Sequence, residues 1–183
     1  MADEQTGTEN VTMPDMMLDD AESQRPPSEG WHPAILTDVT LAYSKEDADL
    51  PAPVRRRNFV LKPELAPDDP EMPGYKPGNL YIPIPTDLEA AFHQGYKPKT
   101  KEEKSRLQQE NPEMFSSDGR TKYAQKMDWI KKAATAFGGK ETGKLDKNFF
   151  VKNIGQTCIV EIEHQDWQGE IQARVKFLGL YPA

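Results

Sequence analysis

The segment Asn148–Tyr181, NFFVKNIGQTCIVEIEHQDWQGEIQARVKFLGLY, contains the most regular strand patterns in the chain. Its runs TCIVEIE (157–163) and EIQARVKFLGL (170–180) alternate apolar and polar residues, which is the period of a half-buried β-strand. The residues between the two runs include Gly169, which suits a turn. The segment therefore predicts a β-hairpin.

Three further strands are predicted upstream. In WHPAILTDVTLAY (31–43), alternate positions from Ile35 to Tyr43 fall on one side, and Trp31 is expected to anchor the core. The second strand lies in VRRRNFVLKPEL (54–65) and the third in GNLYIPIP (78–85). Prolines inside the third strand favour an edge or a bulged strand.

One clear helix is predicted between the third strand and the hairpin. In TKYAQKMDWIKKAATAFGG (121–139) apolar residues recur on one helical face, and the final two glycines are stop signals. TDLEAAFHQGY (86–96) can form a shorter helix capped by Thr86 or Asp87.

The order of three strands, a helix and two strands decides the fold class. A sandwich usually has more strands, and a parallel α/β fold alternates strand and helix throughout. We therefore predict a mainly β protein with one or two helices, built as a five-stranded OB-fold-like barrel. The barrel domain is expected over residues 28–183, with insertions at about 63–77 and 93–120.

Composition fits one such domain in a soluble protein. The chain has 183 residues, and no apolar run approaches the roughly 20 residues that a membrane helix needs. The N-terminus lacks an apolar targeting segment, and a single cysteine, Cys158, fits a reducing compartment. We expect a cytoplasmic protein with no membrane partner, in the host cytoplasm if a phage encodes it.

The net charge of −7 belongs to the N-terminus. Residues 1–30 hold eight acidic residues and one basic residue, so the rest of the chain is neutral with local basic clusters. Residues 1–27 have few large apolar groups and are predicted to be a disordered acidic tail. Within it, five residues are either part of a solvated tail or a short docking peptide for a partner protein: Met16, Met17, Leu18, Asp19 and Asp20.

No catalytic or metal-binding pattern is found. GGKETGK (138–144) nearly matches a phosphate-binding loop, but Leu145 replaces the required Ser or Thr and no helix N-terminus is expected after it. The three histidines lack zinc-ligand spacing. We expect a protein that is not an enzyme and needs no metal or cofactor.

Cationic and aromatic residues on the predicted strands indicate binding instead. RRRNF (55–59) places Arg55, Arg56 and Arg57 at the start of a strand, where they either follow a phosphate backbone or protect a sheet edge. Trp167 at the hairpin tip either stacks on a base or packs back on the barrel. The remaining predicted binding residues are Tyr43, Phe59, Tyr81, Arg174 and Lys176, of which Tyr43 is also a candidate for the core.

The two ends of the domain resemble a known family. PPSEGWHPAILTDV (26–39) and NFFVKNIGQTCIVEIEHQDWQGEIQARVKFLGL (148–180) are similar to phage-type single-stranded-DNA-binding proteins of the OB-fold type. The resemblance implies sequence-tolerant binding of single-stranded DNA in phage replication or recombination. The acidic tail is, from its own residues, a candidate docking segment for proteins of that machinery. The resemblance does not cover the insertions at 63–77 and 93–120.

Two functions therefore remain open on the sequence. The first is a non-enzymatic single-stranded-DNA-binding protein. The second is a structural or adaptor protein, a virion component or a protein-interaction β-barrel that binds no nucleic acid. The sequence leaves the oligomeric state open.

Overall fold

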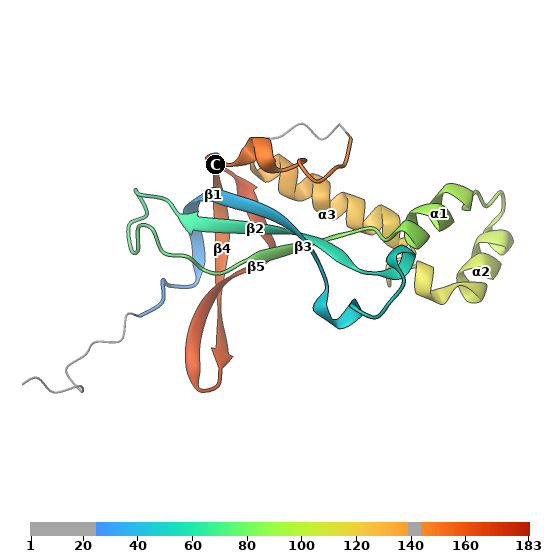
Figure 1. The fold of residues 1–183 in the computed structure, drawn as a ribbon, viewed down its shortest axis with the longest axis horizontal. Coiled ribbons are helices and arrows are strands. Elements are labelled where there is room, and N and C mark those ends of the chain that lie inside the picture. The colour runs from blue at the N-terminus through green and yellow to red at the C-terminus, as the bar shows by residue number, and fades with distance from the viewer. Residues whose placement is uncertain (1–24, 139–143) are drawn as a thin grey trace, which may run out of the picture.

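The computed structural model describes residues 25–138 and 144–183, and these ranges contain five strands and three α-helices (Figure 1). The strands are β1 (Gly30–Tyr43), β2 (Arg57–Leu65), β3 (Leu80–Ile84), β4 (Thr157–Trp167) and β5 (Glu170–Pro182), and the helices are α1 (Asp87–Gly95), α2 (Lys101–Glu110) and α3 (Lys122–Ala136). The predicted mainly β fold with five strands is confirmed, with three helices instead of one or two. Most of the predicted tail, residues 1–24, lies outside the described residues.

The strands form one antiparallel sheet in the order β3-β2-β1-β4-β5. The long strand β1 belongs to both halves, because Ala34–Tyr43 pairs with β2 and Gly30–Ile35 pairs with β4. Figure 1 shows the resulting curled half-barrel, with β1 crossing from one half to the other. Together with the helices between β3 and β4, this arrangement is an OB-fold-like barrel, as predicted.

A β-bulge in β1 changes which residues face the core. The register with β2 shifts between Leu36 and Asp38, and Thr37 is exposed, with its hydroxyl donating to the Lys62 carbonyl at 2.8 Å. Before the bulge the buried positions are even-numbered, whereas beyond it Val39 packs against the core. The prediction of one uninterrupted face along this strand was therefore wrong, because a bulge moves the alternation by one residue.

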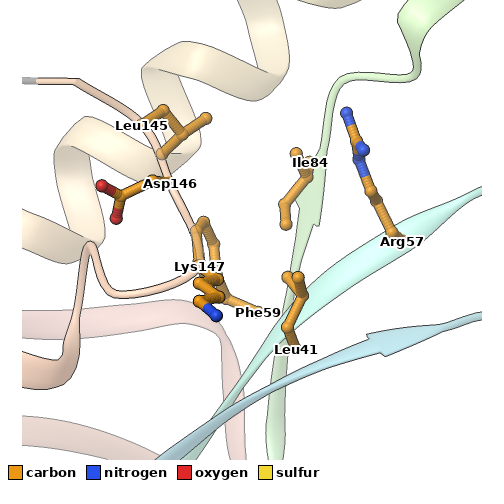
Figure 2. A pocket seen from close by; sticks show the side chains of 7 residues that line it. All are labelled: Leu41, Arg57, Phe59, Ile84, Leu145, Asp146 and Lys147. Carbon is orange, nitrogen blue, oxygen red and sulfur yellow. The ribbon is translucent and has the colours of Figure 1, made fainter.

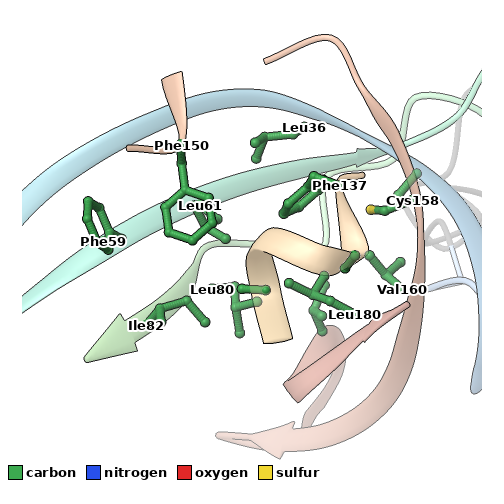
Figure 3. Packing of buried hydrophobic residues seen from close by; sticks show 14 of the residues in the cluster. Leu36, Phe59, Leu61, Leu80, Ile82, Phe137, Phe150, Cys158, Val160 and Leu180 are labelled. Carbon is green, nitrogen blue, oxygen red and sulfur yellow. The ribbon is translucent and has the colours of Figure 1, made fainter. Parts of the chain in front are cut away.

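Helix α3 covers the gap between the two edge strands, where it contacts both β3 and β5. Most of the side chains on its buried face are small: Ala133, Ala134 and Ala136. Phe137, at the end of the helix, and Phe150, just before β4, pack against the strand residues of the core (Figure 3). The core thus sits between the curled sheet and α3.

The segment between β3 and α3 is folded onto this helix. Thr86 and Glu89 form a reciprocal capping box at the start of α1, and the Lys126 ammonium of α3 donates to the Glu89 carboxylate at 2.7 Å. Thr100 caps α2, which begins inside the predicted 93–120 insertion. The insertion therefore adds a helix to the outside of the barrel without interrupting the sheet.

A buried histidine ties the start of β1 to the loop after β2. His32 Nδ1 lies 2.8 Å from Asp69 Oδ2, and His32 Nε2 lies 2.8 Å from the Ser28 carbonyl oxygen. Because a carboxylate and a carbonyl both only accept hydrogen bonds, this geometry requires both ring nitrogens to donate. The protonated form of His32 thus satisfies both acceptors and makes a buried ion pair with Asp69, which lies in the predicted 63–77 excursion.

The His32–Asp69 pair makes stability depend on pH. Burial by itself lowers the pKa of His32, but the hydrogen bonds to Asp69 and Ser28 and the charges of Asp69 and Glu71 outweigh it and hold the pKa above its ordinary value of 6.5. The free energy that a histidine with a raised pKa contributes is complete below pH 6.5 and is lost as pH rises through the folded-state pKa. We expect the unfolding free energy to fall in urea titrations as the pH rises above 6.5, the ordinary pKa of histidine.

Two variants separate this effect from other titrations. His32→Gln should flatten this fall, whereas His93→Gln, which leaves the buried pair in place, should retain it. An unchanged slope in His32→Gln would show that His32 is not the group responsible.

Candidate nucleic-acid interface

The outer side of β1, β2 and β3 carries an open groove of about 580 Å³. We call it the outer groove. Residues of β2 reach it by alternation, because Phe59 and Leu61 point into the core and Asn58 and Lys62 point the other way. It is lined by Thr40, Ala42, Tyr43, Ser44, Lys45, Glu46, Asn58, Val60, Lys62, Asn79 and Tyr81.

Tyr81 is one of two half-exposed aromatic residues in this groove, the other being Tyr43. The Tyr81 side chain is 52% exposed, while its neighbours Leu80 and Ile82 are buried in the core. This orientation is the one expected from the alternation of β3. A half-exposed ring on a rigid strand can stack on a nucleobase without first being uncovered.

Two lysines and two asparagines surround this ring. Lys62 donates to Asp38 at 3.2 Å, and this hydrogen bond is the main reason that the pKa of the Asp38 carboxyl is lowered. Lys45 lies on the β1–β2 connection, and Asn58 and Asn79 supply amide donors. The groove can therefore offer two half-exposed rings, Tyr43 and Tyr81, two cations and neutral hydrogen-bonding groups to a ligand, beside the carboxylate of Glu46.

The three consecutive arginines do not form one patch, because Arg55 and Arg56 bind within the β1–β2 connection and Arg57 binds the junction of β3 and α1. Arg55 donates to the carbonyls of Ala48 and Leu50, with its guanidinium 5.2 Å from the centre of the Tyr43 ring. Arg57 donates to the Pro85 carbonyl at 3.3 Å and to Asp87 at 3.1 Å.

Arg56 organises this connection through a nearly buried carboxylate. Its guanidinium donates to Asp47 Oδ1 at 2.7 Å and to Glu46 at 3.1 Å. Hydrogen bonds from the Arg56 side chain and backbone hold the pKa of Asp47 at about 2, so Asp47 stays charged at any physiological pH. The Arg56 side chain is half-exposed, so a ligand can reach it. Its guanidinium is already paired with Asp47, however, and any ligand would have to share it with that carboxylate.

The predicted cations of the last strand lie on the β4–β5 hairpin and do not line the outer groove. Arg174 donates to Glu163 at 2.7 Å and Lys176 donates to Glu161 at 3.2 Å. Both side chains point outward, as predicted, but each is matched by a carboxylate on β4.

Trp167 is 57% exposed at the tip of the same hairpin. The turn consists of Gln168 and Gly169, which both have positive φ, as two-residue hairpin turns of one type require. In Figure 1 the hairpin and the β1–β2 connection project from the sheet in the same direction. The outer groove lies on the strands beside that connection.

Two aromatic predictions need correction. Phe59 is only 1% exposed, with its ring edge-on to Phe150 at 4.9 Å, so it is not available for stacking on the surface. Trp31 is 60% exposed instead of anchoring the core, and it packs against Tyr181 with ring centres 4.2 Å apart. The buried neighbour of Trp31 is His32, which the sequence analysis did not select.

Most of the groove residues that sequence reasoning missed are polar: Thr40, Ser44, Lys45, Glu46, Asn58, Lys62 and Asn79, beside the apolar Ala42 and Val60. The signal for Asn58 and Lys62 was present, because they alternate with the apolar residues of β2. Two other predicted features, the docking residues 16–20 and most of GGKETGK (139–143), lie outside the described residues.

The sequence matches none of the protein-family models and none of the curated proteins with which it was compared. Within residues 25–138 and 144–183, no group of three or more His, Cys, Asp and Glu side chains is placed to hold a metal ion. No helix in the same ranges is long and apolar enough to cross a membrane. Any assignment of function therefore depends on the fold and the outer groove.

Proposed function

We propose that this protein binds single-stranded DNA with little sequence preference, catalyses no reaction, and uses the outer groove as its binding surface. In this proposal Tyr81 stacks on a base while Lys45 and Lys62 meet phosphates. The setting is phage-type replication or recombination in the host cytoplasm. Residues 16–20 of the acidic segment dock a partner protein of that machinery.

One observation carries the proposal. The half-exposed ring of Tyr81 and the two lysines share a groove on β2 and β3 of an OB-fold-like barrel. OB-folds bind oligonucleotides on this face, between the loops that join strands 1–2 and 4–5. The β1–β2 connection contributes Ser44, Lys45 and Glu46 to the groove, as that mode of binding requires.

Salt dependence tests the proposal directly. We expect a fluorescent oligo(dT) to bind in dilute buffer and its affinity to fall by roughly tenfold when the salt concentration rises fourfold, the loss expected for about two to three neutralised phosphates. Fluorescence anisotropy measures both. Lys62→Gln should reduce the slope of affinity against salt, whereas Lys104→Gln on α2 should not.

A second candidate is a protein-interaction barrel that binds no nucleic acid. Four of the predicted binding cations are paired with carboxylates: Arg56, Arg57, Arg174 and Lys176. These pairs favour the second candidate, because a cation that is already neutralised attracts a polyanion less strongly. Absence of oligonucleotide binding even at low salt would favour this candidate over the first.

A further inference from the structure

The β1–β2 connection (residues 44–56) forms one side of the outer groove, yet it has little regular structure. Only Lys45–Asp47 and Ala52–Val54 within it form short 3₁₀ turns. Its first residues line the groove: Ser44, Lys45 and Glu46. Connections of this kind move more than the strands they join. The groove therefore keeps its shape only if other contacts hold this side in place.

A single carboxylate closes the base of this connection. Asp47 is 3% exposed and does not line the groove. Its Oδ2 accepts the backbone N–H and the Nε–H of Arg56, both at 2.8 Å, and its Oδ1 accepts a terminal guanidinium N–H at 2.7 Å. The Ser44 N–H donates to the Arg56 carbonyl at 2.9 Å, and the Asp47 N–H donates to the Ser44 carbonyl at 3.1 Å. Asp47 therefore fastens the turn that lines the groove to the residue that precedes β2.

Arg55 fastens the next part of the connection. Its guanidinium donates to the Leu50 carbonyl at 2.8 Å and to the Ala48 carbonyl at 3.2 Å. The same guanidinium lies over the Tyr43 ring, so it also holds this ring beside the groove that Tyr43 lines. The connection is thus held by side chains of its own residues.

Arg57 takes no part in this network. It lines a small cavity of about 150 Å³ together with Ile84 of β3, and Figure 2 shows the two side chains next to each other. Its guanidinium donates to Pro85 and Asp87 at the junction of β3 and α1. The position of the β1–β2 connection therefore depends on the other two arginines.

This network removes a cost that a loose connection would incur at binding. A loop that becomes ordered only in the complex loses conformational freedom at that moment, which weakens the affinity. Hydrogen bonds between a carboxylate and a guanidinium are among the strongest in proteins, and Asp47 is nearly buried. Because Arg56 neutralises its charge, Asp47 repels a polyanion little. The net effect of Asp47 on the binding of a negatively charged strand is therefore expected to be favourable.

We infer that Asp47 is a positioning residue for single-stranded DNA: by holding Arg56 it sets the β1–β2 connection so that Tyr43 and Lys45 line the outer groove before the strand arrives. The inference rests on the proposed function. It gives both charges of the pair an indirect role, because an acidic residue raises the affinity for a polyanion and Arg56 acts through the connection instead of through a phosphate.

The signs of two substitutions test this inference. Asp47→Ala and Arg56→Ala should each weaken the binding of a fluorescent oligo(dT) roughly tenfold, about the cost of ordering one or two side chains at binding. A direct contact between Arg56 and a phosphate predicts opposite signs, because Asp47→Ala would then free a cation and strengthen binding. Asp47→Asn keeps one oxygen for the Arg56 backbone N–H and should bind with intermediate affinity.

Hydrogen exchange separates positioning from a general loss of structure. The amides of Ala48 and Leu50 donate to carbonyls within the connection. In Asp47→Ala these amides should exchange faster than in the wild type, while the amides of β2 stay protected. Saturating oligo(dT) should restore their protection, which it would not do for an unfolded barrel.

Asp49→Ala is the matched control, since it removes the same charge from an exposed position of the same connection. It should bind the oligonucleotide at least as tightly as the wild type. Binding by the wild type together with unchanged or tighter binding by Asp47→Ala would overturn the inference and leave the proposed function standing. Faster exchange in Asp47→Ala without any oligonucleotide binding by the wild type would reject the proposed function, and the role of Asp47 in binding with it.

Discussion

Replacing Asp69 with alanine is expected to lower the free energy of unfolding by about 3–5 kcal/mol, the usual cost of leaving one partner of a buried ion pair uncompensated. The His32 ring would keep its hydrogen bond to the Ser28 carbonyl oxygen but would lose the carboxylate that balances its charge. The backbone N–H groups of Glu71 and Met72 would also lose their acceptor, Asp69 Oδ1. Urea or thermal unfolding of the purified variant measures the loss.

Asp68→Ala is the matched control for this experiment. Asp68 precedes Asp69 in the same loop but is exposed, so its replacement should change the unfolding free energy by less than about 0.5 kcal/mol. Asp69→Asn keeps an oxygen for the two backbone donors and should fall between wild type and Asp69→Ala. Equal stability of Asp68→Ala and Asp69→Ala would contradict the structural role of the buried pair.

Replacing Tyr81 with alanine is expected to weaken single-stranded-DNA binding by about 1–3 kcal/mol, or roughly five- to 150-fold, because one stacked base is lost. The fold should remain intact, since the ring is half-exposed and its buried neighbours are unchanged. Anisotropy titration at low salt measures the affinity, and circular dichroism verifies the fold.

Two variants make the Tyr81 result specific. Tyr81→Phe keeps the flat ring and should bind nearly as well as wild type. Trp31→Ala removes a ring of similar exposure that packs on Tyr181, outside the outer groove, and should leave the affinity unchanged. Equal losses of affinity in Trp31→Ala and Tyr81→Ala would indicate that exposed aromatic residues bind DNA non-specifically, wherever they lie on the surface.

Local periodicity was sufficient to predict most of the fold. The strands that became β1 to β5 and the helix that became α3 follow patterns of two and 3.6 residues, which backbone geometry imposes on any half-buried element. The bulge at Thr37 could not be predicted this way. The bulge is a shift in the register of β1 against β2, so it depends on both strands and not on the sequence of β1 alone.

The candidate site was harder to predict because the partners of charged residues are distant in sequence. Nothing local to Arg174 marks Glu163 as its neighbour, since only the register of β4 and β5 brings them together. Likewise, the burial of His32 depends on Asp69, 37 residues further along the chain. Orientation along a strand was easier, as Tyr81 illustrates.

The proline of β3, Pro83, has a consequence for the behaviour of concentrated solutions. A half-barrel leaves β3 and β5 at the two margins of its sheet, and such margins are where chains adhere to one another and form aggregates. Pro83 carries no amide hydrogen to offer an incoming chain, β3 is only five residues long, and α3 packs beside both margins. These features protect both margins of the sheet against pairing with another chain.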